Sequence, residues 1–252
     1  NLLLTPMDII NLSEHVSLNK ISQKKNVGIF AIEGLAAGYG LTIGTALRRV
    51  LLTSLPGAAV TQVKIKDASH EFSTYPGLQE DLVLFSLNFK KLRFACHSDE
   101  PQVVVLSAKG EGPITGEHIK TNNLVELSNP EQVLGHLTKK TAKIDIEITV
   151  ERGMGYVTTD KNKEKLPVGS IGVDAIFSPI VRVNLEVEDM RVGKKTDFNR
   201  ATLELETDGT IKPKDAIEHA TKVLKDHFSK ILGEEVEMPE SEEKEEEVEV
   251  EA

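Results

Sequence analysis

The stretch GYGLTIGTALRRVLLTSLPGAAVTQVKI, residues 38–65, contains the most informative helix of the chain. Tyr39 to Leu55 predicts a helix, and Pro56-Gly57 predicts its end, because proline and glycine interrupt helices. The helix is apolar on two sides at about 100° per residue. One stripe contains Ile43, Ala46, Leu47, Val50 and Leu51, and a roughly opposite face contains Leu41, Leu52 and Leu55.

A helix that is apolar on two sides must be covered on two sides. One explanation is burial inside a single larger core. The other is that its own sheet covers one side and a partner covers the other. Gly44, Thr45 and Ala46 are small enough to allow close approach of a neighbour. The pattern alone leaves both explanations open.

A second long helix is predicted from Pro213 to Leu232. Pro213 suits the first helical position, Asp215 suits the first turn, and Gly233 suits the residue after the helix. Lys212 occupies the capping position but cannot accept a hydrogen bond, so we expect a weak cap. The apolar stripe, with one histidine, comprises Ala216, Ile217, Ala220, Val223, Leu224, His227, Phe228 and Ile231.

Alternation of apolar and polar residues predicts antiparallel β-strands with one wet face. It is clearest at residues 144–150, 181–187 and 203–205, and another strand is predicted at Val27 to Ile32. Residues 59–179 read as mostly β, with many turn signals.

The composition, 39% hydrophobic and 28% charged, is that of an ordinary globular protein. No apolar run approaches the roughly 18 residues of a membrane helix, and residues 1–10 lack the pattern of a signal peptide. The single cysteine, Cys96, cannot form an internal disulfide. These features predict a cytoplasmic location without membrane contact.

The net charge of −10 lies entirely in the last residues. Glu234 to Ala252 contains 11 Glu and one Lys, which leaves 29 acidic and 29 basic residues elsewhere. A neutral body argues against a dedicated DNA-binding domain, because such domains show a basic excess. We expect the acidic tail to be disordered.

The segment Gly38-Tyr39-Gly40, with Gly44, could serve as a phosphate-binding loop at a helix start, and Asp67 ends the next strand. The alternative function is therefore a nucleotide-binding enzyme that uses the Gly38–Gly44 loop. That fold needs alternating strands and helices. A further helix is hard to place before Pro213, so we give this alternative little weight.

No pattern of catalytic or metal-binding residues is found. The seven histidines form no HExxH or CxxC combination, and Cys96-His97 are merely adjacent. Glu80-Asp81 and Glu188-Asp189 read better as a solvated turn and a strand end than as metal ligands. We predict no catalytic residue, no metal and no cofactor. Arg48-Arg49 is either a pair of surface cations or part of an interface, where arginine is favoured.

Six blocks resemble, in order, those of bacterial RNA polymerase alpha subunits. Residues 38–65 are similar to the signature helix of that family, and HEFSTYPGLQED (70–81) to the loop that follows. The remaining blocks are ERGMGYV (151–157), VDAIFSP (173–179), VEDMRVGKKTD (187–197) and TDGTIKPKDAI (207–217). The resemblance covers roughly residues 25–232.

The chain also departs from the family pattern. Leu41 and Thr45 stand where the family usually has His and Asn, and Met154 stands for Arg. Lys212 replaces a usual capping acid, and Gly34, Ala36 and Ala37 replace a proline and charged residues. These departures suggest a divergent lineage.

The resemblance implies an α+β fold with two subdomains. Residues 1–55 and 180–233 are expected to form a dimerisation subdomain, an antiparallel sheet with two long helices. Residues 56–179 are expected to form an inserted β-rich subdomain, followed by the acidic tail at 234–252.

The resemblance also implies a non-catalytic homodimer that scaffolds the beta and beta-prime subunits of DNA-directed RNA polymerase. The nucleotidyl transfer chemistry belongs to those large subunits. The expected dimer interface comprises Ile43, Leu47, Val50, Leu51, Ala220, Leu224, Phe228 and Ile231. The expected large-subunit contacts are Arg48, Arg49, Lys90, Asp174, Ser178, Arg191 and Lys195.

Family members usually continue into a small helical domain that binds promoter DNA. This sequence continues into the acidic tail at 234–252 instead, so we expect little or no direct contact with DNA. A third hypothesis is a free-standing dimeric binding protein that no longer joins the polymerase.

Overall fold

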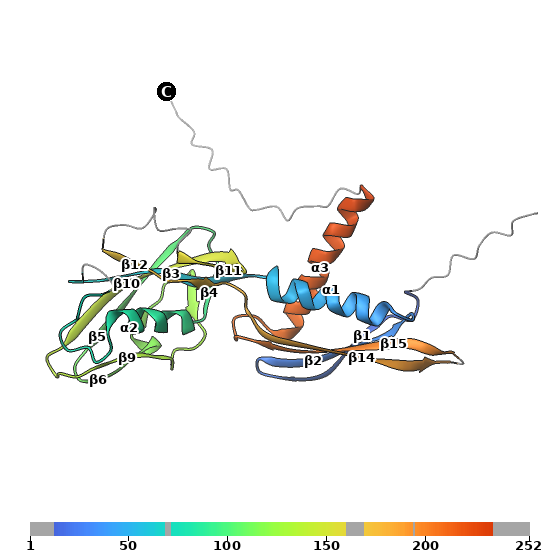
Figure 1. The fold of residues 1–252 in the computed structure, drawn as a ribbon, viewed down its shortest axis with the longest axis horizontal. Helices are drawn as coiled ribbons and strands as arrows, with labels where there is room; N and C mark the ends of the chain where they lie inside the picture. The colour runs from blue at the N-terminus through green and yellow to red at the C-terminus, as the bar shows by residue number, and fades with distance from the viewer. Residues whose placement is uncertain (1–12, 69–71, 160–168, 194, 234–252) are drawn as a thin grey trace, which may run out of the picture.

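The computed structural model describes residues 13–68, 72–159, 169–193 and 195–233 of the 252-residue chain. Within these residues the fold is α+β, as predicted, and Figure 1 shows two lobes. The terminal lobe contains β1, β2, α1, β14, β15 and α3. The insert lobe contains the elements from β3 to β13, including α2.

The terminal lobe is built on a four-stranded antiparallel sheet with the order β1-β2-β15-β14. Two of its strands come from each end of the described chain, and α1 packs on β14 and β15. The elements are β1 (Ser17–Lys24), β2 (Val27–Leu35), α1 (Tyr39–Thr53), β14 (Ile180–Val192), β15 (Lys195–Thr207) and α3 (Pro213–Leu232).

The insert lobe is built on a seven-stranded sheet in which β3 and β10 are central. Two separate strand pairs, β6 with β9 and β11 with β13, complete it. The sheet strands are β3 (Pro56–Ile65), β4 (Phe94–Cys96), β5 (Gln102–Lys109), β7 (Ile119–Lys120), β8 (Val125–Leu127), β10 (Lys143–Met154) and β12 (Ser170–Gly172). The other elements are α2 (Leu82–Asn88), the 3₁₀ turns Phe89–Lys91 and Gly116–His118, β6 (Gly112–Thr115), β9 (Val133–Leu137), β11 (Tyr156–Val157) and β13 (Ala175–Ile176).

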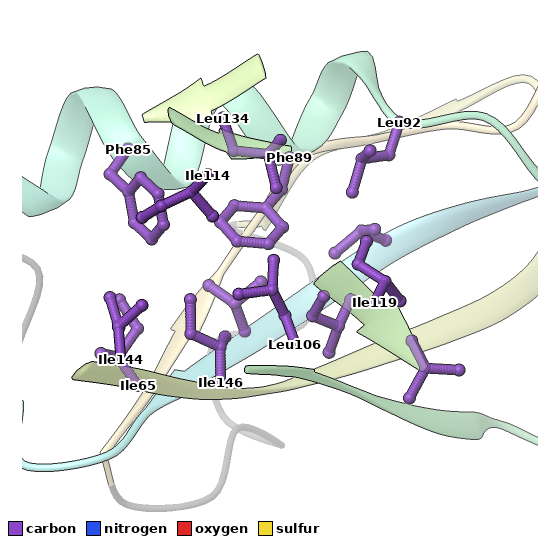
Figure 2. Packing of buried hydrophobic residues seen from close by; sticks show 14 of the residues in the cluster. Ile65, Phe85, Phe89, Leu92, Leu106, Ile114, Ile119, Leu134, Ile144 and Ile146 are labelled. Carbon is purple, nitrogen blue, oxygen red and sulfur yellow. The ribbon is translucent and has the colours of Figure 1, made fainter. Parts of the chain in front are cut away.

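Each lobe has its own hydrophobic core. In the insert lobe, Phe85 and Phe89 pack edge to face at 5.2 Å between ring centroids and are fully buried. Figure 2 shows these rings above the sheet residues Leu106, Ile144 and Ile146. The alternation predicted at 144–150 places every second side chain of β10 in this core.

The core of the terminal lobe lies between its sheet and its two helices. Phe30, Leu203 and Leu205 point inward from the strands, while Leu47 and Leu51 point inward from α1. The first turns of α3 close the same core. The two core clusters share no residue.

The junction between the lobes is packed around Phe177. A Cβ atom added at Gly57 would lie 1.9 Å from the carbonyl oxygen of Phe177, and one at Gly153 would lie 2.8 Å from its ring. Ala59 and Ala175 complete this small buried cluster. Only glycine at positions 57 and 153 lets these backbones approach so closely.

The helix predictions are largely confirmed. The second helix has the predicted bounds, with Gly233 in the left-handed conformation at its end and no side-chain cap from Lys212. The first helix ends at Thr53, with Ser54 as its cap. It therefore ends two residues before the predicted Leu55, and Pro56-Gly57, predicted to end it, begins β3.

One helix and one strand stand out among the elements that were not predicted individually. Helix α2 (Leu82–Asn88) is capped by Asp81, whose side chain accepts a hydrogen bond from the Leu84 N–H at 2.6 Å. Strand β1 lies at the edge of its sheet and is almost entirely exposed, so it lacks the alternation that reveals a strand.

Candidate functional site

The glycines at the start of α1 bring this helix against the sheet. The Gly38 N–H donates to Asn199 Oδ1 at 2.8 Å, so it is already bonded within the chain. A Cβ atom added at Gly44 would lie 2.6 Å from Leu185 Cδ1, so this glycine allows α1 to pack closely on β14. The Gly38–Gly44 segment therefore has a packing role, which removes the main observation behind the nucleotide-binding alternative.

The first apolar stripe of α1 faces the core of its own lobe. Leu47 and Leu51 are buried there, and Ile43 and Val50 are half-buried against the same cluster. A partner could contact the half-buried pair but cannot reach the two leucines in this conformation. Their predicted part in dimerisation would therefore be indirect, through the position of the helix.

The second apolar face of α1 is divided. Leu55 lies beyond the end of the helix and is buried in the terminal core. Leu41 is 64% exposed and Leu52 is 36% exposed, so the described residues cover this side of α1 only in part.

The apolar stripe of α3 runs past the core of its own protomer. Ala216, Ile217 and Ala220 are buried in that core, and Leu224 is half-buried at its margin. One turn later the same stripe reaches Phe228, which is 61% exposed, and then Ile231 at 80%. Figure 1 shows the second half of α3 projecting away from the terminal sheet.

Arg48 and Arg49 lie on the exposed side of α1. Among the described residues neither side chain takes part in a salt bridge, and only the Arg49 carbonyl is engaged, by the Thr53 hydroxyl at 2.8 Å. Both guanidinium groups are therefore open to a partner.

Lys90 and Asp174, 84 residues apart, lie in direct contact in the insert lobe. Lys90 Nζ is 3.1 Å from Asp174 Oδ2, which also accepts the Tyr156 hydroxyl at 3.0 Å. The second oxygen, Oδ1, accepts the Thr159 N–H at 2.9 Å and the Thr159 hydroxyl at 3.0 Å. Lys90 also lies over the Tyr156 ring, 5.7 Å from its centroid. We call these four residues the Asp174 network.

The hydrogen bonds of the Asp174 network shift two pKa values. The Thr159 N–H and the Lys90 ammonium, followed by the two hydroxyls, hold the pKa of Asp174 well below its usual range despite partial burial. The bond to the Asp174 carboxylate raises the pKa of Tyr156, since losing the phenolic proton would place two anions together.

Two further predicted contact residues, Ser178 and Arg191, have hydrogen-bond partners outside this network. Ser178 is half-buried and its hydroxyl accepts a long hydrogen bond from the Ile180 N–H at 3.4 Å. Arg191 is exposed and its Nε donates to the Gly193 carbonyl at 2.7 Å. Lys195 begins β15, and its side chain lies outside the described part of the structure.

Side chains of the two acidic pairs, Glu80-Asp81 and Glu188-Asp189, bind other groups of the same chain. Asp81 caps α2, while Glu80 binds the His136 ring nitrogen at 2.8 Å. Burial raises the pKa of Glu80, but its hydrogen bonds with His136 outweigh burial, so the net shift is downward. Glu188 pairs with Arg200 at 2.9 Å. In the described residues no group of three or more His, Cys, Asp or Glu is arranged to hold a metal ion.

Comparison with known proteins identifies the family. Residues 63–178 match the family model described as the RNA polymerase Rpb3/RpoA insert domain. A DNA-directed RNA polymerase subunit alpha from Symbiobacterium thermophilum is 47% identical over 214 residues, which are 84% of this chain and 68% of the relative. The chain belongs to the family of bacterial DNA-directed RNA polymerase alpha subunits.

Two further alpha subunits give similar values. The relative from Moorella thermoacetica is 50% identical over 207 residues, 82% of this chain and 66% of the relative. The relative from Roseiflexus sp. is 46% identical over 204 residues, 81% of this chain and 63% of the relative. The chain thus spans about two thirds of the length of the curated alpha subunits it matches. The residues matched by the insert-domain model of this family include nearly the whole core of the insert lobe.

The resemblance described from the six sequence blocks is confirmed by these matches. In the part of the chain that the structure describes, no helix is both long and apolar enough to cross a membrane.

Proposed function

We propose that this chain is a non-catalytic subunit of DNA-directed RNA polymerase, which forms a homodimer and scaffolds the beta and beta-prime subunits. The names of its relatives support membership of that complex, whose activity is nucleotidyl transfer. The chain acts there by binding, since its arginine pair and apolar stripes are arranged as contact surfaces rather than as a reaction centre. The proposed place of action is the cytoplasm.

The proposed homodimer is supported mainly by the exposed second half of the apolar stripe on α3. Phe228 and Ile231 continue the same stripe as Ala220 and Leu224, and an exposed surface of this kind marks an interaction site. Another copy of α3, placed antiparallel or crossed, offers a stripe of the same kind, as a two-fold interface requires. Leu41 and Leu52 of α1 extend the apolar surface available to the partner.

We further propose that the two lobes are subdomains with separate tasks, bounded as 1–55 with 180–233 and 56–179. The separate cores support this division. In this arrangement the terminal lobe carries the dimer contacts and Arg48-Arg49. The insert lobe carries the Asp174 network.

The dimer is tested best at positions that are exposed in the protomer. Val50→Asp and Leu224→Asp should also abolish the dimer, but both residues touch the protomer core, so unfolding would confuse the result. The double variant Phe228→Asp/Ile231→Asp places two carboxylates on the uncovered stripe. We expect a folded monomer, measured by sedimentation velocity and circular dichroism. Lys222→Asp, which adds a carboxylate on the opposite face, should remain dimeric. A dimeric double variant would refute the interface.

The scaffold role is tested by capture of the large subunits. Tagged chain is co-expressed with beta and beta-prime, and the captured amounts are compared for wild type, Arg48→Ala and Arg49→Ala. We expect weaker capture by the arginine variants with an unchanged dimer, because each variant removes an unpaired exposed guanidinium. Lys109→Ala, on the exposed end of β5, is the matched control. If wild type captures neither large subunit, the free-standing binding protein becomes the better explanation.

A further inference from the structure

The first turn of α1 is weakly held by the helix itself. Its N-cap residue is Gly38, which has no side chain, and the turn contains no acidic residue. The Thr42 N–H lies 3.5 Å from the Gly38 carbonyl oxygen, so the first hydrogen bond of the helix is long. This turn nevertheless carries Tyr39 and Leu41, which are 44% and 64% exposed. A turn of this kind needs a hydrogen-bond partner from outside the helix in order to stay ordered.

Asn199 of β15 supplies that partner. Although it is polar, Asn199 is only 7% exposed. Its Oδ1 accepts the Gly38 N–H at 2.8 Å, and its Nδ2 donates to Asp189 Oδ1, also at 2.8 Å. Both ends of the amide are therefore hydrogen-bonded, which offsets the cost of burying this polar group.

Asp189 determines which way the amide of Asn199 points. The two residues are directly opposite each other in the register of β14 and β15. An ionised carboxylate only accepts hydrogen bonds, so the amide must turn its NH₂ group toward Asp189. The carbonyl oxygen of the amide then faces Gly38, where an acceptor is needed.

The first half of α1 also packs closely on the paired strands β14 and β15 (Figure 1). A Cβ atom added at Gly40 would lie 2.8 Å from Asn199 Cβ and 2.8 Å from Val187 Cγ1. One turn further along the helix, Gly44 meets Leu185, which precedes Val187 by two residues on β14. The hydrogen bond and these close contacts therefore fix the same position of α1 on the two strands.

We propose that Asn199, oriented by Asp189, is a positioning residue for the homodimer. It holds the first turn of α1 in place, so that Tyr39 and Leu41 are presented to the second copy of the chain. This rests on the proposed dimer, in which exposed apolar residues of α1 extend the surface formed by α3. Because the turn is already ordered in the protomer, less conformational entropy is lost when the dimer forms.

The experiment measures the dissociation constant of the dimer by sedimentation equilibrium, with the whole chain at several concentrations. Asn199→Leu keeps the approximate volume of the side chain but removes both hydrogen bonds. We expect the dissociation constant to rise by roughly five- to tenfold, the size of effect that loss of a helix cap has. The protomer should remain folded, as judged by circular dichroism.

The matched control is Asn129→Leu in the insert lobe. Asn129 also joins two backbone groups, since its Oδ1 accepts the Arg93 N–H at 2.9 Å and its Nδ2 donates to the Lys91 carbonyl at 2.8 Å. This variant should lose stability without any change in the dissociation constant. If both variants weakened the dimer equally, Asn199 would act only through overall stability, and the positioning role would be refuted.

A swap of the two side chains tests the orienting role of Asp189. Asn199→Asp alone places two carboxylates opposite each other on neighbouring strands, so it should weaken the dimer. Adding Asp189→Asn to this variant restores a donor between the two side chains, and the dissociation constant should return close to the wild-type value. Asp189→Asn alone keeps an acceptor opposite Asn199 and should change little. If Asn199→Asp had the same effect with either residue at position 189, Asp189 would not orient the amide.

Hydrogen exchange follows the first turn of α1 directly. It is measured in the background of Phe228→Asp/Ile231→Asp, so that any change belongs to the protomer and not to the dimer. Adding Asn199→Leu should speed exchange at Gly38 and in the first turn of α1, whereas exchange in the insert lobe should be unchanged. Unchanged exchange in the first turn would show that Asn199 does not hold it in solution.

The two proposals fail in different ways. A wild-type chain that is monomeric at every concentration would refute the homodimer. A dimeric wild type with an equal dissociation constant for folded Asn199→Leu would refute only the positioning role. If Asn199→Leu does not fold, the swap of Asp189 and Asn199 decides.

Discussion

The helical segment formed by α2 and the 3₁₀ turn Phe89–Lys91 uses apolar side chains in the opposite way to the end of helix α3. Phe85 and Phe89 of the insert lobe are fully buried, whereas Phe228 and Ile231 of the terminal lobe are largely exposed. Both pairs lie on apolar stripes at helical spacing. The difference teaches that the insert lobe completes its core from its own chain, whereas the terminal lobe leaves part of an apolar stripe for another molecule.

The largest expected effect comes from truncating a phenylalanine in each lobe. Phe85→Ala should lower the free energy of unfolding by about 3–5 kcal/mol, because it leaves a cavity in a closed core. Phe228→Ala should cost the isolated protomer less than about 0.5 kcal/mol but weaken the dimer. Urea denaturation at several protein concentrations measures both. If both variants lost the same free energy of unfolding at every protein concentration, the proposed difference between the two lobes would be wrong.

The second effect tests the junction between the lobes. Gly57→Ala forces a methyl group into the Phe177 carbonyl and should cost about 1–3 kcal/mol or more, since backbone must move. Gly110→Ala, at a turn with φ of +97° and open space around it, should cost only about 1 kcal/mol of backbone strain. Thermal unfolding measures the stability of both variants. If Gly110→Ala were the less stable one, the backbone at the junction would be able to shift at little cost.

The third effect compares the helix N-termini of the two lobes. Asp81→Ala removes the cap of α2 and should destabilise the protein by about 1 kcal/mol. Lys212→Asp supplies the side-chain cap that α3 lacks and should stabilise it by about 0.5–1 kcal/mol. The extended backbone of Lys212, with φ −74° and ψ 143°, already suits a capping residue. A destabilised Lys212→Asp variant would show that the carboxylate does not reach the helix.

The smallest effect is a pH dependence confined to the insert lobe. The pKa of Asp174 is lowered on folding, so its stabilising contribution is present above the unfolded-state pKa of about 3.9 and is lost as pH falls through the folded value. The stability difference between wild type and Asp174→Asn should be constant at neutral pH and shrink below about pH 4. Urea midpoints at stepped pH measure it. A difference that persists in strong acid would exclude ionised Asp174 as its source.

The parts of the fold that were predicted carry strong local signals. Pro213 and Gly233 mark both ends of α3, and the alternation at 144–150 marks β10. The missed elements lack such signals. Helix α2 has only seven residues, too few for a helical period to stand out, although Asp81 before an apolar run was a usable cap signal. Exposed β1 is defined by its pairing with β2, which is a tertiary property.

The candidate site could be predicted only in part, for a related reason. Spacing places Ala220 and Ile231 on one stripe, but only the structure shows that the sheet and α1 cover the first and not the second. Lys90 and Asp174 were both expected to contact large subunits. Their contact with each other, across 84 residues, has no local signature in the sequence.

The touching backbones of Gly57 and Phe177 have a consequence for the order of folding. Strands β2 and β15 pair across most of the chain, a closure that is slow and entropically costly for a long flexible loop. The two ends of the insert lobe, about 120 residues apart in sequence, are in contact once this lobe is folded. The folded insert thus acts as a short tether, so the terminal sheet closes as if its halves were near neighbours in the chain.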